Sequence, residues 1–471
     1  MRFDFEGQVT SIDSLPDEVL FAIFGFFVDE DACRKKDIEA WQSLVHVCRR
    51  WRCVVFGSPR RLNLQLCCEP GTPVRDRLDI WPPLPLVIRG STYPTDDCGD
   101  NLITILERRD RVCRIYLWDA ELPLEKLMVA MQEPFPELTD LVLDTFFTAT
   151  VLPDSFLGGS VPRLRKLYLD RIPFPGLPNL LLSATHLVEI QLYNIPYSGY
   201  FSPEALVTAL STLTSLRLLT LKSISSPSLA NRCSPPTRSL LPVLNTLRFE
   251  GADEYLDDLV ARIDAPRLNN LEITFLDQDK FSIPQFTQFI HRTPMLVALE
   301  KTYVDFESNN AAVKLSSQTL GCGELKVKIP CREYRQVSSL KQFCTSYLPL
   351  STSEDLYISG DIEPQDREGD VDNIVWLELL HLFTGVKNLH LSEDIAPHIV
   401  LSLQELVGGS TTGVLSIVQN ISLEGIRPRR PVLEGIDNFI AARQLSGQLI
   451  TFSTIPLWDS DLMYWVEQFT D

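Results

Sequence analysis

Few residues of this chain have the type and spacing that catalysis requires. Ser338 and Lys341 form an S-x-x-K pattern, which could pair a nucleophile with a base, but so short a pattern arises by chance in most chains of 471 residues. The chain has neither the G-x-x-x-x-G-K sequence of a phosphate-binding loop nor a G-x-S-x-G nucleophile turn. We therefore expect no catalysis by this chain and no bound cofactor.

Residues that could bind a metal are present but poorly spaced. The cysteine pairs at 48 and 53 and at 67 and 68 lack the paired spacing of a zinc site. The six histidines have no acidic residue at a spacing that would indicate a shared site. Asp366, Asp370 and Asp372 could hold calcium weakly, but a solvated acidic loop is far more common. We expect no metal site.

The charge balance bears on possible partners. Lys and Arg number 43 against 62 Asp and Glu, which gives a net charge of −19. An acidic protein repels phosphate backbones and anionic lipids, so we expect neither nucleic acid nor a membrane as a partner. The eleven cysteines are scattered and the first residues do not resemble a signal peptide, so the sequence favours the cytoplasm or the nucleus.

Two segments near the N-terminus are strongly apolar and need other residues to bury their surface. LPDEVLFAIFGFF (15–27) and LVHVCRRWRCVV (44–55) both have helical spacing, and the first is apolar nearly all round. So few residues cannot bury this much apolar surface alone. The segments could form an N-terminal cap on the following domain, or they could bind another protein.

The residues of these segments resemble the F-box motif, with its Leu-Pro opening and Val-Cys-Arg-x-Trp closing. The middle of the motif is longer and more charged here than usual. The resemblance implies binding to a Skp-type adaptor and, through it, to the cullin of a ubiquitin ligase. The residues expected at the adaptor are Leu15, Pro16, Ile23, Phe24, Leu44, Val47, Cys48 and Trp51.

The rest of the chain repeats an apolar-x-x-apolar-x-apolar pattern. Twelve copies, from VCRIYL at 112 to VQNISL at 418, start 23 to 33 residues apart, and two fainter copies precede them at 59 and 83. Several intervening segments, such as 202–215 and 254–266, have the spacing of amphipathic helices. This period is typical of leucine-rich repeats, in which each unit supplies one short strand and a return segment.

These features together predict the fold class. Fourteen strands exceed the roughly ten that one open sheet usually holds, which disfavours a plain α/β domain. We predict an α/β fold with a three-helix F-box domain at residues 1–57, followed at 58–471 by a leucine-rich-repeat solenoid with a curved parallel sheet. The array lacks the usual Asn or Cys ladder and resembles the irregular repeats of fungal F-box proteins.

The open face of the predicted sheet is the candidate surface for a target protein. Side chains alternate along a strand, so residues flanking the inward apolar positions line this face. Neighbouring aromatic residues there favour recognition, and two aspartates beside them favour a basic or mixed-charge ligand. The residues expected to bind a target are Tyr116, Trp118, Asp144, Tyr168, Asp170 and Tyr193.

Two functions agree with these predictions. The chain could be a non-catalytic substrate receptor that holds the ligase with its N-terminal helices and the target with its array. It could instead be an interaction scaffold that binds the adaptor without directing ubiquitin transfer. The sequence does not identify the target.

Overall fold

The computed structural model of the chain has two compact units, Met1–Leu187 and Val188–Asp471, which we describe one after the other. The boundary predicted between residues 57 and 58 lies inside the first unit and stays a prediction. The structure describes residues 12, 15–27, 35–57, 59–69, 78–91, 96–118, 124–145, 151–223, 237–276, 281–297, 299–307, 309–317, 323–332, 335–348, 350–360, 373–408, 414–424 and 430–455.

Four helical segments open the described part of the first unit, where the sequence predicts three. They are α1 (Asp17–Gly25), α2 (Lys35–Ile38), α3 (Trp41–Val45) and α4 (Arg49–Gly57). The predicted helix over 44–55 is thus divided by a turn. One straight helix would hold Leu44 and Val55 about 16 Å apart. The turn instead lets both side chains join one apolar cluster.

The same unit continues with parallel strands that pair in chain order. The strands are β1 (Leu66–Cys68), β2 (Leu86–Ser91), β3 (Val112–Trp118), β4 (Asp140–Asp144) and β5 (Lys166–Asp170). The connections contain α6 (Asp96–Leu106), α7 (Leu124–Ala130), the 3-10 helix η2 (Phe156–Gly159) and α8 (Leu177–Leu181). Parallel strands need such crossover connections, which confirms the predicted alternation of strand and return segment.

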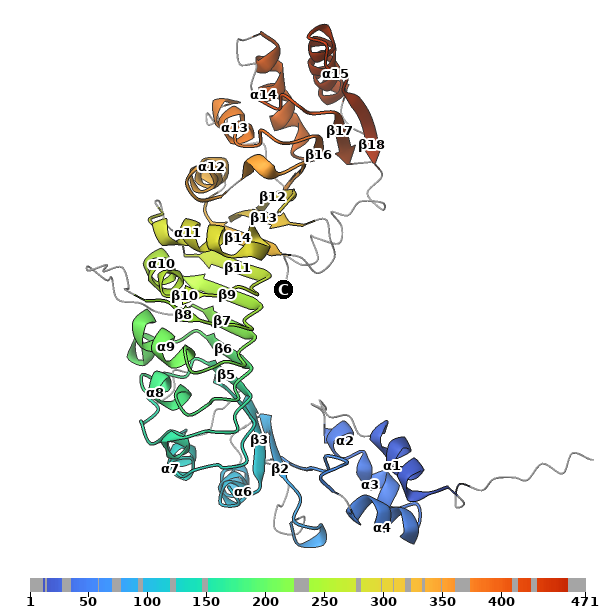
Figure 1. Cartoon of the computed structure of the whole chain (residues 1–471), viewed down its shortest axis with the longest axis vertical. Helices are drawn as coiled ribbons and strands as arrows, with labels where there is room; N and C mark the ends of the chain where they lie inside the picture. Colours follow the sequence, from blue (N-terminus) through green and yellow to red (C-terminus); the bar gives the residue numbers. More distant parts are fainter. Residues whose placement is uncertain are drawn as a thin grey trace, which may run out of the picture. The chain divides into compact units, whose positions relative to one another are not determined.

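The second unit extends the alternation over more strands, and Figure 1 shows its helices along one side of them. Its strands include β6 (Glu189–Tyr193), β7 (Leu218–Lys222), β9 (Thr246–Gly251), β11 (Asn270–Phe275), β15 (Asp355–Gly360), β16 (Asn388–Ser392), β17 (Asn420–Glu424) and β18 (Thr451–Ile455). Its α-helices are α9 (Pro203–Leu210), α10 (Asp253–Ala261), α11 (Pro284–Arg292), α12 (Gln336–Tyr347), α13 (Asn373–Leu380), α14 (Ala396–Gly408) and α15 (Arg430–Leu445). Shorter elements are the 3-10 helices η3 (Tyr197–Gly199), η4 (Pro294–Leu296) and η6 (Leu350–Thr352), and the pair β8 (Ser239–Leu240) and β10 (Ile263–Asp264).

An antiparallel insertion interrupts the parallel order in the middle of this unit. The strands β12 (Lys301–Glu307), β13 (Asn310–Ser316) and β14 (Glu324–Pro330) are ordered β11–β14–β13–β12–β15, with β13 antiparallel to both neighbours. The sequence predicted successive parallel repeats at 296 and 322, which is wrong for this stretch. Only residues 308 and 309 separate β12 from β13, and so short a connection can join only antiparallel strands.

The repeated apolar positions form the core, as the pattern predicts. Alternate side chains such as Leu141 and Leu143 in β4, or Leu219 and Leu221 in β7, are buried. The chain leaves several strands through a residue with positive φ; the residues directly after β5, β6 and β7 are Arg171 (57°), Asn194 (51°) and Ser223 (52°). The repeat therefore includes a left-handed turn that the sequence pattern did not predict.

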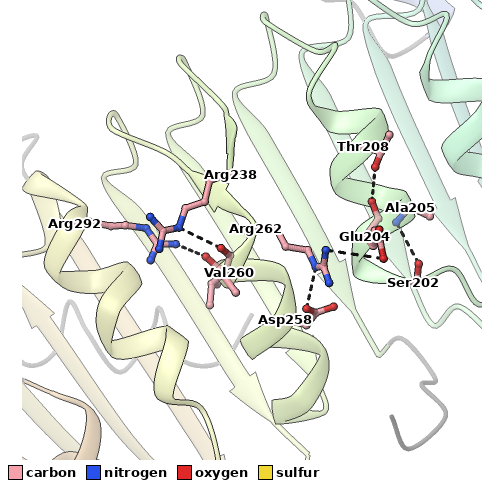
Figure 2. Close-up of polar contacts among 10 residues, drawn as sticks. Ser202, Glu204, Ala205, Thr208, Arg238, Asp258, Val260, Arg262 and Arg292 are labelled. Carbon is pink, nitrogen blue, oxygen red and sulfur yellow. Dashed lines mark hydrogen bonds and ion pairs between the residues drawn. The ribbon is translucent and has the colours of Figure 1, made fainter. Parts of the chain in front are cut away.

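Arginines at the ends of helices tie neighbouring repeats of the second unit together. Figure 2 shows the side chain of Arg292, at the end of α11, directed to the carbonyl of Val260 in α10. Arg292 Nε also donates to Asp264 Oδ1 at 2.8 Å. Arg262 follows α10, and its Nη1 lies 4.0 Å from Oε2 of Glu204 in α9. Cations at helix C-termini satisfy carbonyls that have no partner within their own helix.

A buried carboxylate connects α10 with the start of α11. Asp257 is buried, and its Oδ1 accepts hydrogen bonds from the backbone N–H groups of Gln285 (2.8 Å) and Phe286 (3.2 Å). The first turn of a helix has N–H groups without intrahelical partners, and a carboxylate there also favours the helix dipole. Asp257 thus caps a helix of the neighbouring repeat rather than its own.

Candidate functional site

The helices α1, α3 and α4 of the first unit share a small core. Phe24 of α1 is fully buried, and its ring lies 4.8 Å from that of Trp51 in α4, measured between centroids. The cluster contains Leu20, Phe24, Trp41, Leu44, Val45, Val54, Val55, Leu62, Leu64 and Leu84. Because the last three belong to the segments before β1 and β2, this core joins the helices to the first strands.

One side of α1 and of the turn after it remains apolar and exposed. We call Val19, Ile23, Phe26 and Phe27 the α1 face. The first three are four and three residues apart, so they follow one side of the helix and its end. Phe26 is 94 % exposed, although aromatic side chains contribute the most apolar area when they are buried. The α1 face is therefore the strongest candidate for a docking surface in this unit.

The structure places the eight predicted adaptor residues in three different environments. Phe24 and Leu44 are buried in the helical core. Leu15, Cys48 and Trp51 are half-buried, and Pro16, Ile23 and Val47 are exposed. Nothing observed here tests their binding roles, which stay predictions.

The predicted adaptor residues do not include Val19, Phe26 and Phe27, although all three lie in the apolar segment 15–27. The signal was present, because a helix that is apolar nearly all round cannot turn every side toward one small core.

Ionic and backbone contacts fix the orientation of α1. Arg50 of α4 pairs with Asp17 at 2.7 Å, and its Nη2 donates to the carbonyl of Leu15. Arg52 Nε donates to the carbonyl of Val45 at 3.0 Å and braces the turn between α3 and α4. An exposed ion pair contributes about 1 kcal/mol or less. These contacts therefore serve mainly to position the segment, while the apolar core stabilises it.

The helices also pack directly on the strands of the same unit. Trp41 Nε1 donates to the carbonyl of Gln65 at 2.9 Å, and the Trp41 ring meets that of Trp81 edge-on with centroids 5.0 Å apart. Ile38 of α2 lies in a cluster with Cys67, Val87, Cys113 and Tyr116. Tyr116, predicted to bind a target, therefore packs beside α2. The N-terminal segments thus cover the first strands while leaving the α1 face at the surface.

The other predicted target residues lie on strands β3 to β6. Trp118 is half-buried, with the guanidinium of Arg89 5.0 Å from the centroid of its ring. Tyr168 pairs in register with Val142 of β4 and is half-buried. Tyr193 belongs to the second unit, where its hydroxyl donates to Gln191 Oε1 at 2.9 Å. Whether any of these residues binds a target stays a prediction.

Asp144 and Asp170 are neighbours in register on β4 and β5, and the same arginine forms an ion pair with each of them. Arg171 Nη1 lies 3.3 Å from Asp144 Oδ1, and its Nη2 lies 3.7 Å from Asp170 Oδ2. Arg171 also donates to the carbonyl of Thr145 at 2.6 Å. The sequence argument for a basic ligand considered the two aspartates alone, so it did not include Arg171, whose single positive charge offsets one of their two negative charges.

The residues singled out for chemistry have other contacts. Ser338 Oγ donates to the carbonyl of Arg335 at 2.9 Å, and Lys341 Nζ pairs with Glu378 at 2.6 Å. Burial raises the pKa of the Cys67 and Cys113 thiols to about 12, which keeps them protonated at neutral pH. In the described part of the chain no group of three metal-binding side chains gathers. Asp366, Asp370 and Asp372 lie outside the described residues.

None of the helices in the described ranges is long and apolar enough to cross a membrane.

Fold and surface together define a class of protein: a small helical domain with an exposed apolar face, attached to an α/β repeat array. A comparison with known families identifies the helical domain: residues 12–62 match the family model F-box-like. The chain thus carries an F-box-like domain, a type that typically binds Skp-type adaptors. No curated protein sequence matches the chain.

Proposed function

We propose that this protein is a non-catalytic substrate receptor of a Skp-cullin-F-box ubiquitin ligase. The observation that carries the proposal is the exposed α1 face within a segment that matches the F-box-like family. A monomeric domain gains nothing by leaving Phe26 and Phe27 in water, whereas a docking surface needs such side chains. The adaptor would bind there and connect the chain to cullin.

Within this proposal, surface and core residues have different roles. Val19, Ile23, Phe26 and Phe27 would contact the adaptor, together with the predicted Pro16 and Val47, which are exposed as well. Phe24, Leu44 and Trp51 would act indirectly, because their packing holds α1 in place. A test of binding should therefore change the α1 face and leave the helical core intact.

The repeat array would hold the target protein. Its support is architectural: repeat arrays offer extended surfaces built from one unit after another. Half-exposed Trp118 and Tyr168 on β3 and β5 are the aromatic residues best placed to contribute affinity there. This proposal includes the assignment of the repeats as irregular leucine-rich repeats similar to those of fungal F-box proteins.

Co-purification separates the receptor from the scaffold. The full chain, tagged and expressed in cells, should retain both the Skp-type adaptor and cullin, and Phe26→Ala with Phe27→Ala should lose both. Leu445→Ala is a matched control, because Leu445 is 92 % exposed on α15 of the other unit. Retention of the adaptor without cullin would favour the scaffold, and unchanged retention by the double variant would overturn the docking surface.

A further inference from the structure

A cavity of about 540 Å³ lies in the first unit, where its strands begin. Its lining includes Pro85, Arg111, Glu137 and Arg163, which precede β2, β3, β4 and β5 by one to three residues. Residues of the segment 59–64, between α4 and β1, line it as well. Stacked repeats bring equivalent positions side by side, so residues far apart in sequence meet here. The volume lies within the about 300 to 1,000 Å³ of sites that bind small organic molecules.

Part of the lining is apolar and rigid. It consists of Pro59, Pro83 and Pro85, together with the buried Leu64 and Leu84. The N–H of Leu64 donates to the carbonyl of Pro59 at 3.0 Å and so closes the turn that carries the first of these prolines. Each proline ring fixes its own φ. The apolar lining is therefore formed before a ligand arrives, which lowers the entropy cost of binding.

Three arginines and two carboxylates supply the charge of the cavity. Arg163 forms an ion pair with Glu137. Arg111 donates from Nε and Nη2 to the carbonyl of Leu84, at 3.0 and 2.9 Å, and in the described part of the chain it forms no ion pair. Arg60 is exposed, and its side chain has neither an ion pair nor a hydrogen bond to any residue that the structure describes.

The lining therefore has one positive charge in excess, although the whole chain has a net charge of −19. Asp110 is the second carboxylate, and it is exposed. Burial lowers the pKa of Arg111, because desolvation disfavours the charged guanidinium. Two N–H groups of Arg111, on Nη1, have no acceptor within the described ranges. An anion at Nη1 would satisfy these donors and offset the desolvation.

We propose that this cavity binds a single organic carboxylate, with Arg60 and Arg111 as donors and the prolines against the apolar part of the ligand. The planar guanidinium group matches a carboxylate with two parallel N–H groups. A phosphate group with two negative charges fits less well, because its second charge would lie beside Asp110 and Glu137. A bare ion would leave most of the cavity to water, since one water molecule occupies only about 30 Å³.

This site does not depend on the proposed receptor function. Free organic acids and the C-terminal residues of peptides both combine one carboxylate with an apolar group, so the test includes a probe for each source.

Calorimetric titration of the full chain with 3-phenylpropionate tests the proposal. We expect saturable binding, and binding at least about tenfold weaker for the neutral 3-phenylpropionamide, because charge-assisted hydrogen bonds are lost. The second probe is the peptide acetyl-Ala-Ala-Phe with a free C-terminus. Tighter binding of the peptide than of 3-phenylpropionate assigns the cavity to peptide ends, and equal or weaker binding assigns it to free acids. If neither carboxylate binds, the proposal is overturned.

Substitutions in the lining test the roles of its charges. Arg60→Gln should weaken 3-phenylpropionate binding at least about tenfold and leave the thermal stability unchanged, since Arg60 is exposed and has no partner among the described residues. Arg165→Gln is the matched control, because Arg165 is exposed and does not line the cavity. Unchanged binding by Arg60→Gln would refute its role.

Removing the carboxylates should change the selectivity of the cavity. Asp110→Asn with Glu137→Gln raises the excess from one positive charge to three. Inorganic phosphate should then compete with 3-phenylpropionate, whereas it should not compete in the parent. Equal competition in the parent and the double variant would contradict the preference for a single carboxylate.

Arginine labelling of the parent chain locates the bound probe. With phenylglyoxal and mass-spectrometric readout, Arg60 and Arg111 should react about tenfold more slowly when 3-phenylpropionate is present at about ten times its Kd, because about a tenth of the sites then remain free. The rate at Arg165 should not change. Equal rates at Arg60 and Arg111 with and without the probe would overturn the proposal.

Discussion

Replacing Phe26 by alanine is expected to weaken adaptor binding without loosening the fold. Phe26 is 94 % exposed, so the free protein loses no packing when the ring is removed. Burying a phenylalanine side chain contributes about 1.5 to 3 kcal/mol. If the ring is buried at the adaptor, the variant should therefore bind about 10- to 150-fold more weakly.

Phe24→Ala is the matched comparison, two positions away and identical in chemistry. Phe24 is 0 % exposed and packs on Trp51, so its removal leaves a cavity in the helical core. Such a change costs about 3 to 5 kcal/mol of folding free energy. Trp51→Ala should behave similarly, because the same contact is lost from the other side.

Two measurements check the pair. Calorimetric titration with purified adaptor gives the affinity, and urea unfolding followed by circular dichroism gives the stability. Phe26→Ala should change only the first, and Phe24→Ala should lower the second. If Phe26→Ala binds as tightly as the parent, or if it destabilises the helical domain as much as Phe24→Ala does, the assignment of the α1 face is refuted.

Three further predictions concern the rest of the chain. Asp257→Ala should lower the free energy of unfolding by about 1 to 3 kcal/mol in urea, because two backbone N–H groups of α11 lose their acceptor. Trp118→Ala with Tyr168→Ala should lower ubiquitination of the targets in cells while adaptor binding persists. Cys67 should resist iodoacetamide at pH 8 when alkylation is followed by mass spectrometry, since its thiol titrates near pH 12 and is buried.

Two of these predictions, at Asp257 and at Cys67, have a control in the chain. Asp258→Ala, next to Asp257, removes only a partly exposed pair with Arg262 and should cost about 1 kcal/mol or less. Cys53 is exposed and should be alkylated first. Equal losses at the two aspartates, normal target modification by the aromatic double variant, or equal rates at the two thiols would contradict the respective prediction.

The linear pattern was enough to predict the class of fold. Periodic leucines such as Leu141 and Leu143 identify strands, because a strand buried on one side has an apolar residue at every second position. The opening and closing residues of the helical segment likewise pointed to the F-box motif, and residues 12–62 match that family model. Both signals are local: each depends on residues a few positions apart, which the sequence displays directly.

Pairing between distant residues was decided only in three dimensions. The hairpin of β12 and β13 reverses the strand order, which depends on pairing between strands and cannot be read from the pattern within one strand. The same limit affected the candidate sites: Ile23 and Phe24 are adjacent in sequence, yet one is exposed and the other buried. Arg171 offsets Asp144 from 27 positions away. Periodicity gives the direction of a side chain within its own element, whereas its exposure and charge environment depend on which other elements pack against it.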